Sequence, residues 1–174
     1  MMLIKSEKII IVGQSGSGKD FLLKELSKKG LIPSVKITTR PKRLIEVEGV
    51  NYKFLTNKDF GNQNLIVEQS FINDKGDLWK YGISSDDFDS SQIFIMTPGE
   101  LSQLTISNRK RAFVVYLDID RQVRESRILD RVDNNDSVIR RLNADEIDFK
   151  DFSNYDLKVT DPVFDIEMIL SLMS

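Results

Sequence analysis

Residues 8–30 read KIIIVGQSGSGKDFLLKELSKKG, and this stretch decides the fold. The run Lys8–Val12 is short, apolar and rich in β-branched residues, which predicts a buried strand. A glycine-rich turn follows. Leu22, Leu23 and Leu26 then recur at helical spacing up to Gly30, a residue type that commonly ends a helix. The stretch therefore predicts a strand, a tight turn and a helix in that order.

The turn has the spacing of a phosphate-binding loop. Gly13, four further residues, Gly18 and Lys19 match the pattern G-x-x-x-x-G-K. Such glycines let backbone N–H groups face inward around an anion, and the helix that follows adds its positive N-terminal end. An ordinary glycine-rich turn is the alternative, but the strand, the helix and the lysine favour a phosphate loop. We expect Lys19 to be catalytic, and the phosphates of ATP to contact Gly13, Ser15, Gly16, Ser17, Gly18, Lys19 and Asp20.

Asp20 is where this loop departs from the pattern, which has a Ser or Thr whose hydroxyl binds Mg²⁺. A carboxylate is a hard oxygen ligand, so Asp20 is a candidate metal ligand, directly or through water. An aspartate also suits the first turn of a helix, where it caps N–H groups and stabilises the positive end. The residues leave both interpretations open.

The rest of the chain alternates strand and helix patterns, which predicts an α/β fold with a central parallel sheet. Two continuous apolar runs, 92–96 and 112–118, are typical of buried parallel strands. The stretch from about residue 40 to 88 is predicted to be a small β-rich insertion with a hairpin around Asp74–Gly76. Further strands are predicted at 34–39, 51–55, 65–69 and 156–160, and helices at 121–131, 137–147 and 163–173.

Composition narrows the possible chemistry. The chain has 174 residues, 40% hydrophobic and 30% charged, as expected for one globular domain. No apolar run is long enough for a membrane span and the N-terminus does not resemble a signal peptide, so we expect a cytoplasmic protein with no membrane partner. The absence of Cys and His excludes disulfides, thiolate metal sites and the usual histidine base. A net charge of −2 indicates no nucleic-acid partner.

A basic turn follows the predicted strand 34–39. Arg40 and Arg43 flank a proline, and Tyr52 follows nine residues later. Guanidinium groups bind phosphate through two parallel hydrogen bonds, and a tyrosine hydroxyl can add another donor. A solvated basic turn is the alternative interpretation.

A second basic group lies on the predicted helix 121–131. Arg121, Arg124, Arg127 and Arg131 are spaced three, three and four residues apart, which places them along one helix face. Aligned like charges favour an anionic partner. The alternative is a solvated face in which neighbouring acids pair with the arginines.

The order GQSGSGKD … TTRPKR..E.EG..Y.F … IVEQ … YG … R...R … IRRL … NYD resembles guanylate kinase through most of the chain. That family's acceptor segment is similar to S-x-T-T-R-x-P-R-x-G-E-x-x-G-x-x-Y-x-F, and gaps enter here only around Gly76–Lys80. The resemblance implies one domain: a three-layer P-loop NTPase core (1–37, 89–120 and 148–174), a nucleoside-monophosphate-binding insertion (38–88) and a helical lid (121–147). The residues in register are Thr38, Thr39, Arg40, Arg43, Glu46, Gly49, Tyr52 and Phe54.

The resemblance also implies roles for individual residues. Glu68 would accept hydrogen bonds from guanine, although an outward-facing strand glutamate is the alternative. Arg131 and Arg141 would be catalytic, closing over the transferred phosphoryl group together with a third lid residue, Arg127. The nucleoside monophosphate would contact Thr38, Arg40, Arg43, Glu46, Tyr52, Glu68 and Tyr81, four of which, Arg40, Arg43, Tyr52 and Tyr81, would hold its phosphate.

Four positions depart from the family pattern. Asp20 replaces the metal-binding hydroxyl, and Lys36 stands where the family has a serine that helps to read guanine. Ile83 replaces a Ser or Thr, and Thr97 stands where an acidic residue normally helps to organise metal or base. We expect the acid gained at Asp20 to compensate for the acid lost near Thr97.

The resemblance implies Mg²⁺- and ATP-dependent phosphorylation of GMP or dGMP by a monomer or homodimer. Because Lys36 and Ile83 affect base recognition, a kinase that accepts several (deoxy)nucleoside monophosphates is an alternative. A catalytically inactive binding module is a second, although the intact phosphate loop argues against it. A nucleic-acid-binding NTPase is a third, disfavoured by the absence of a basic surface signal outside these segments.

Overall fold

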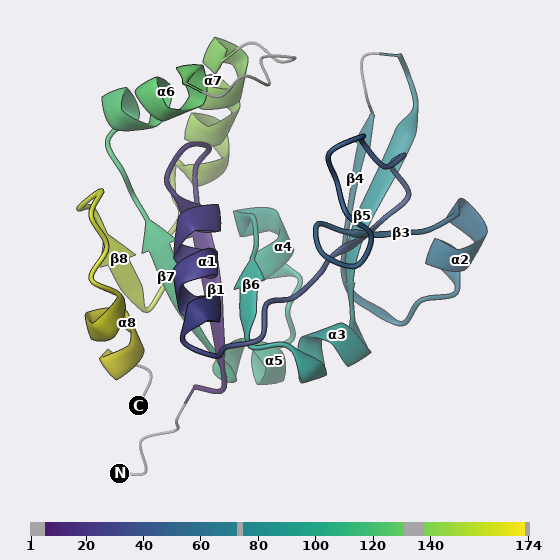
Figure 1. Cartoon of the computed structure of the whole chain (residues 1–174), viewed down its shortest axis with the longest axis horizontal. Coiled ribbons are helices and arrows are strands. Elements are labelled where there is room, and N and C mark those ends of the chain that lie inside the picture. The colour runs from purple at the N-terminus through teal and green to yellow at the C-terminus, as the bar shows by residue number, and fades with distance from the viewer. Residues whose placement is uncertain (1–5, 73–74, 131–137, 173–174) are drawn as a thin grey trace.

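The computed structural model describes residues 6–72, 75–130 and 138–172, without the side chains of residues 140 and 141. Its first sheet is fully parallel, in the order β6-β1-β7-β8. The strands are β1 (Lys8–Gly13), β6 (Ile93–Ile95), β7 (Ala112–Leu117) and β8 (Leu157–Val159). Every residue of β1 is buried because helices cover both faces of the sheet, which explains its continuous apolar sequence (Figure 1).

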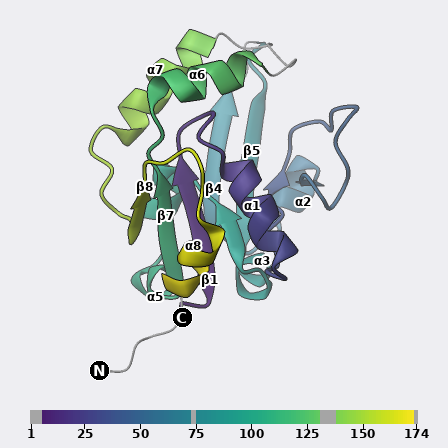
Figure 2. The same ribbon diagram turned by 60° about the vertical axis from the view of Figure 1, so that its left-hand side comes forward.

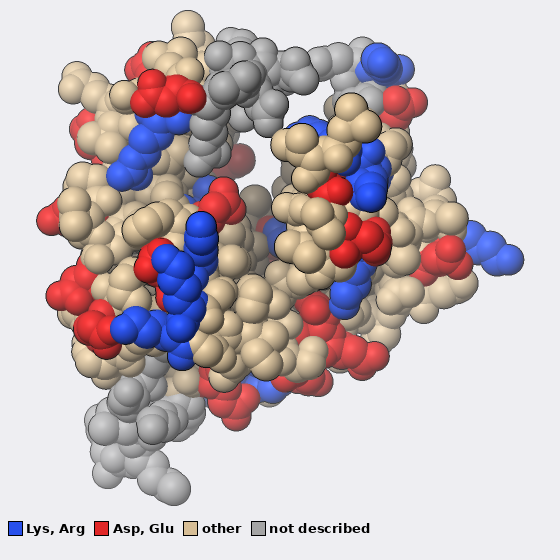
Figure 3. All heavy atoms as spheres, viewed as in Figure 1, with Lys and Arg blue, Asp and Glu red and all other residues tan. Residues whose placement is uncertain are grey.

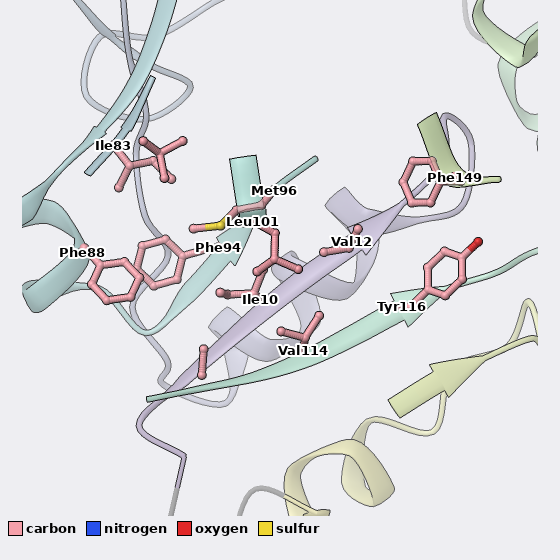
Figure 4. Packing of buried hydrophobic residues seen from close by; sticks show 12 residues of the cluster. Ile10, Val12, Ile83, Phe88, Phe94, Met96, Leu101, Val114, Tyr116 and Phe149 are labelled. Carbon is pink, nitrogen blue, oxygen red and sulfur yellow. The ribbon is translucent and has the colours of Figure 1, made fainter. Parts of the chain in front are cut away.

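Helices on both faces make the first sheet the middle of three layers. α1 (Lys19–Lys28) and α8 (Ile166–Leu172) pack on one face, where Leu22, Leu26 and Ile169 contact odd-numbered strand residues such as Ile9 and Ile11. The other face carries α3 (Ser85–Ser90), α4 (Pro98–Ser102) and α7 (Val138–Phe149). Figure 4 shows this second cluster.

The second sheet is mixed and lies beside the first. Its order is β3-β2-β5-β4, with β2 (Ile37–Thr38), β3 (Lys53–Phe54), β4 (Leu65–Ile72) and β5 (Leu78–Ser84). α2 (Asn57–Gly61) connects β3 to β4. Val67 on β4 pairs with Ile83 on β5. Both residues belong to the apolar cluster between the first sheet and helices α3, α4 and α7. The base of the second sheet is therefore part of the main core.

Two helices lie above the carboxyl end of β1, where the glycine-rich turn begins (Figure 2). They are α6 (Arg121–Leu129) and α7, which contact each other. None of the described helices is both long and apolar enough to cross a membrane.

The α/β fold with a central parallel sheet is confirmed, whereas several element assignments were wrong. The strands predicted at 34–39 and 51–55 shrink to two residues each. The helix predicted to reach residue 131 ends at Leu129, and the one predicted to stop at residue 147 runs to Phe149. Four short helices, α2 to α5 (Ile106–Lys110), were missed because each has fewer than two turns. Their starts are marked by hydroxyl caps, at Thr56, Ser84, Thr97 and Thr105.

The hairpin between β4 and β5 is confirmed by the pairing of Ile72 with Leu78, although residues 73–74 lie outside the described residues. The division into core, insertion and lid stays a prediction. β2 begins at residue 37 and already pairs within the second sheet.

Candidate functional site

The glycine-rich turn joins β1 to α1 with a backbone that only glycine adopts easily. Gly16 and Gly18 have φ angles of +76° and +99°. A Cβ on Gly16 would lie 2.6 Å from the carbonyl oxygen of Arg124, and one on Gly18 would lie 3.0 Å from the ring of Phe164. The turn is therefore packed directly against α6 and the segment before α8.

Lys19 lies over this turn. Its Nζ donates to the carbonyl oxygens of Gly13 at 2.7 Å and Gln14 at 2.9 Å. Ser17 is fully buried, and its Oγ has no hydrogen-bond partner among the described residues. A cation and inward-facing polar groups thus surround the turn, as phosphate binding requires.

A carboxylate from α7 also contacts the turn. The backbone N–H of Ser15 donates to Oδ2 of Asp145 at 2.7 Å. The same oxygen lies 3.9 Å from Nη1 of Arg124, whose side chain is only 3% exposed. Sequence reasoning did not single out Asp145, because the contact joins residues 130 positions apart.

Asp20 lies in the first turn of α1 and is exposed. The helix is capped at Gly18 without a side-chain hydrogen bond, so the structure does not show Asp20 as a hydrogen-bonding cap. Among the described residues no group of three or more acidic side chains could hold a metal ion. Mg²⁺ usually takes one or two carboxylates together with phosphate and water, and a single exposed carboxylate beside the turn fits that role.

Asp20 also lines a cavity of about 370 Å³ between the two sheets. Figure 3 shows the surface hollowed in this region. Leu23 and Phe94 come from the first sheet's layers, and Tyr52 and Ile83 from the second sheet's side. The cavity therefore connects the candidate phosphate loop to the candidate acceptor segment.

Arg127 is the one predicted lid arginine whose side chain the structure describes. Its Nη1 donates to the carbonyl oxygens of Gly16 and Ser17, both at 3.2 Å, and its Nη2 donates to Pro162. Arg131 lies outside the described residues, and of Arg141 only the position on α7 is described. The three predicted lid arginines are thus only partly located.

A second cavity, of about 440 Å³, opens on the other side of the turn. Arg127, Pro162 and Phe164 line it together with Phe21, whose ring centroid lies 6.1 Å from that of Phe164. Sequence reasoning missed both phenylalanines. The available signal was an aromatic residue directly after the glycine-rich turn, Phe21.

The acceptor segment is built around a buried arginine. Arg40 is 5% exposed and forms two hydrogen bonds with Glu46, at 2.6 and 3.1 Å. Its guanidinium also lies 5.4 Å from the ring centroid of Tyr52, and the ring of Tyr52 lies 5.8 Å from that of Tyr81. The structure therefore brings together four of the residues expected to bind the monophosphate.

Electrostatics in this cluster favour charged Arg40 and neutral Tyr52. Burial opposes the charge on Arg40, but hydrogen bonds to Glu46 and Tyr81 outweigh it and raise the pKa of Arg40. The hydrogen bond from Arg40 lowers the pKa of Glu46 below its ordinary 4.5. Burial, followed by the nearby Tyr81, raises the pKa of Tyr52. The cluster thus offers a fixed cation beside a protonated hydroxyl.

Thr38 and Arg43 complete the segment in different ways. The buried hydroxyl of Thr38 donates to the carbonyl of Lys80 and accepts from the backbone N–H of Arg40, so it holds the segment against β5. Arg43 is exposed, and its backbone N–H donates to Glu46 at 2.8 Å. Of the two arginines, Arg43 has the solvent-facing side chain.

Glu68 does not join this cluster. It pairs with Gly82 across β4 and β5, whereas Tyr81 pairs with Gln69. Because side chains alternate along a strand, Glu68 and Tyr81 lie on opposite faces of the sheet. The side chain of Glu68 is half exposed, and its Oε1 lies 3.6 Å from Nζ of Lys80. Its expected role in reading guanine stays a prediction.

Ile83 lies on the same face of β5 as Tyr81, and its partner on β4 is the apolar Val67. Val67 and Ile83 are each 1% exposed and belong to the core. They offer no hydrogen bond to a base at the inner end of the second sheet. Lys36, another departure from the family pattern, lines the cavity and donates to both carboxylate oxygens of Glu100 at 2.7 Å.

Thr97 has a structural task at the start of α4. Its hydroxyl accepts from the backbone N–H of Glu100, and Glu100 accepts in return from the N–H of Thr97, forming a capping box. Thr97, where the family pattern has an acidic residue, is therefore hydrogen-bonded to a buried acidic residue, Glu100.

Known guanylate kinases are similar to this chain. The family model described as guanylate kinase matches residues 5–80. The guanylate kinase of Rickettsia prowazekii is 33% identical over 125 residues, which cover 70% of this chain and 54% of that protein. That of Clostridium perfringens (strain SM101) is 44% identical over 66 residues, which cover 37% of this chain and 30% of that protein. The chain thus spans about half, or less, of these relatives' length.

A solved structure supports the fold. The crystal structure of guanylate kinase from Anaplasma phagocytophilum superimposes with a TM-score of 0.60 and covers 99% of this chain and 85% of that one. At 17% identity this likeness concerns the fold alone. The matched sequence segments make guanylate kinases the proteins that this chain is similar to, and the solved structure shows that it shares their fold.

Proposed function

We propose that this protein transfers a phosphoryl group from ATP to a nucleoside monophosphate, with GMP or dGMP as the acceptors that the family favours. One observation carries the proposal. Asp20, beside the phosphate loop, and Tyr52, beside the buried Arg40, line the same cavity of about 370 Å³. A cavity between two phosphate-binding groups suits direct transfer from one nucleotide to another.

On the donor side, the loop from Gly13 to Asp20 would hold the phosphates of ATP, including through the N–H group of Ser15. The cavity of about 440 Å³ beside Gly18 would take the base, against the rings of Phe21 and Phe164 that line it. Aromatic rings at this distance provide apolar surface for a flat base.

Transfer would depend on positioning and on cations, because phosphoryl transfer asks for little covalent chemistry from the protein. Lys19 would leave the carbonyl oxygens of Gly13 and Gln14 to contact the transferred group. Arg131 and Arg141 are proposed to contact it from the lid. Asp20 would hold Mg²⁺, which neutralises phosphate charge when bound.

On the acceptor side, Arg40, Arg43, Tyr52 and Tyr81 would hold the monophosphate. Thr38 and Glu46 would fix Arg40 in place, because each forms hydrogen bonds with it. A planar guanidinium held at both nitrogens by a carboxylate is well oriented for a second anion.

A kinase with several acceptors is the second candidate function. The burial of Val67 and Ile83 and the position of Glu68 on the opposite sheet face favour it, because none of the three offers guanine a hydrogen bond inside the cluster. An inactive binding module is less well supported, since Lys19 and the loop geometry are intact. For either kinase we propose a monomer or homodimer.

A coupled ADP-release assay across GMP, dGMP, AMP, CMP, UMP and dTMP, with ATP and Mg²⁺, tests these alternatives. Turnover restricted to GMP and dGMP supports the first candidate, and comparable turnover with several acceptors supports the second. Absence of turnover with every acceptor would refute both. A Lys19→Met variant measured in parallel shows whether any ADP released comes from this site.

A further inference from the structure

The phosphate loop holds a carboxylate supplied by the chain itself. Oδ2 of Asp145, on α7, accepts the backbone N–H of Ser15 at 2.7 Å. In loops of this type, those backbone N–H groups bind phosphate oxygens. The Asp145 oxygen is therefore an anion in contact with a group suited to a phosphate oxygen.

Arg124 lies near the same oxygen, and its guanidinium group has hydrogen-bonding capacity left over. Its side chain is 3% exposed, and its Nε donates to the carbonyl of Ile119 at 2.9 Å. Its Nη1 lies 3.9 Å from Oδ2 of Asp145, beyond hydrogen-bond distance, and has no hydrogen-bond partner among the described residues. A buried, incompletely bonded guanidinium is costly unless it has another task.

The unsatisfied polar atoms gather at the loop. Among the described residues, the buried side-chain atoms without a hydrogen-bond partner are Gln14 Oε1, Ser17 Oγ and Arg124 Nη1. Gln14 and Ser17 belong to the loop, and the backbone of Arg124 packs against it at Gly16. Two of the three atoms, Ser17 Oγ and Arg124 Nη1, can donate to a phosphate oxygen.

We propose that Arg124 is a further phosphate-binding residue of the donor site, and that Asp145 competes with the nucleotide for the loop. When ATP binds, a phosphate oxygen takes the N–H of Ser15, the Asp145 carboxylate withdraws, and Nη1 of Arg124 donates to the phosphate. This inference rests on the proposed binding of ATP at this loop.

Isothermal titration calorimetry with Mg²⁺-ATP tests the exchange without an acceptor or turnover. We expect Asp145→Ala to tighten ATP binding by about tenfold, because it removes a competing charge-assisted hydrogen bond. Asp145→Asn, which keeps the side-chain shape, is expected to tighten binding in the same direction and guards against a folding defect in the alanine variant. Asp148→Ala, an exposed residue on the same helix, is the matched control and is expected to change nothing.

Arg124→Met separates phosphate binding from a purely structural pair. We expect it to weaken ATP binding, and Asp145→Ala/Arg124→Met to bind ATP more weakly than Asp145→Ala alone. If Arg124 served only to pair with Asp145, the double variant would match the Asp145→Ala variant. Circular dichroism and thermal melting confirm that each variant is folded.

The outcomes distinguish this inference from the proposed function. Unchanged or weaker ATP binding in both Asp145 variants overturns the exchange while leaving the kinase proposal intact. Tighter binding in the variants of a protein that phosphorylates no monophosphate overturns the kinase proposal alone. Failure of every form, including the unaltered protein, to bind ATP overturns both.

Discussion

The proposed donor side and the proposed acceptor side of the cavity are built in different ways. The proposed donor side is one loop of eight consecutive residues, 13–20, in which Gly16 and Gly18 have positive φ angles that glycine adopts easily. The acceptor side is assembled from strands between residues 37 and 84, and its geometry depends on their register. A contiguous motif carries its own geometry, whereas a shift of one residue between strands turns a side chain to the opposite face.

Lys36 and Glu100 show how this difference affects the interpretation of single residues. From the sequence, Lys36 was interpreted as a replacement of the serine that helps to read guanine in the family pattern. In the structure, both oxygens of Glu100, which is 1% exposed, accept from Lys36. The Lys36–Glu100 pair therefore fixes the position of Lys36 in the wall of the cavity.

The largest effect on stability is expected from Lys36→Met. It leaves Glu100 as a buried carboxylate without its cation, which costs about 3–5 kcal/mol of unfolding free energy. Chemical denaturation measures the loss, and Lys36→Met/Glu100→Leu should recover most of it. If the single variant is as stable as the unaltered protein, Lys36 is not required to hold Glu100, and the ligand role inferred from the sequence becomes the better interpretation.

On the donor side, Lys19→Met should lower the rate of ADP release by about 100-fold or more, because it removes the cation that stabilises charge during transfer. Stopped assays at saturating ATP and GMP measure the rate. Lys24→Met, which changes an exposed lysine of the same helix, is the control and should keep full activity. Equal activity of the two variants would contradict the donor site.

Glu46→Gln tests the acceptor cluster through pH. Because the hydrogen bond from Arg40 lowers the pKa of Glu46 below 4.5, the ionised pair contributes stability above that pH. This contribution is lost as the pH falls through the lowered pKa. We expect the variant to lose about 2 kcal/mol at pH 7 and progressively less in more acidic buffer.

Urea denaturation at pH 7 and at pH 3.5 measures the two differences. Glu48→Gln changes a nearby exposed carboxylate that does not contact Arg40 and serves as the control. A difference between variant and unaltered protein that is the same at both pH values would show that the ionised Arg40–Glu46 pair is not its source.

The smallest effect is expected from Glu68→Gln. Its half-exposed ion pair with Lys80 at 3.6 Å contributes at most about 1 kcal/mol, and its side chain lies on the face opposite Tyr81. The KM for GMP should therefore change by less than about twofold, whereas Tyr81→Phe should raise it by about tenfold. Steady-state kinetics measure both. A large rise in the KM for GMP but not for AMP would restore the guanine-reading role that the resemblance implies.

The long apolar strands and the glycine-rich turn between β1 and α1 could be predicted from the sequence because their signals are local. The runs predicted as strands at 8–12 and 112–118 are mostly apolar, and they became β1 and β7, in which every residue except Phe113 is buried. The short helices were missed because a helix of five or six residues has too few turns for a periodic pattern. Thr97 illustrates this, since its cap on α4 was interpreted as a lost acid.

By itself the sequence determined the α/β class, the strand, glycine-rich turn and helix of residues 8–28 and the absence of histidine chemistry, because each depends on residue types or on neighbours along the chain. Only the tertiary structure decided which side chains far apart in the sequence come into contact. It placed Asp145 on the loop from 130 residues away, joined Lys36 to Glu100 and turned Glu68 away from Tyr81. These contacts follow from strand register and helix packing, which depend on the whole core.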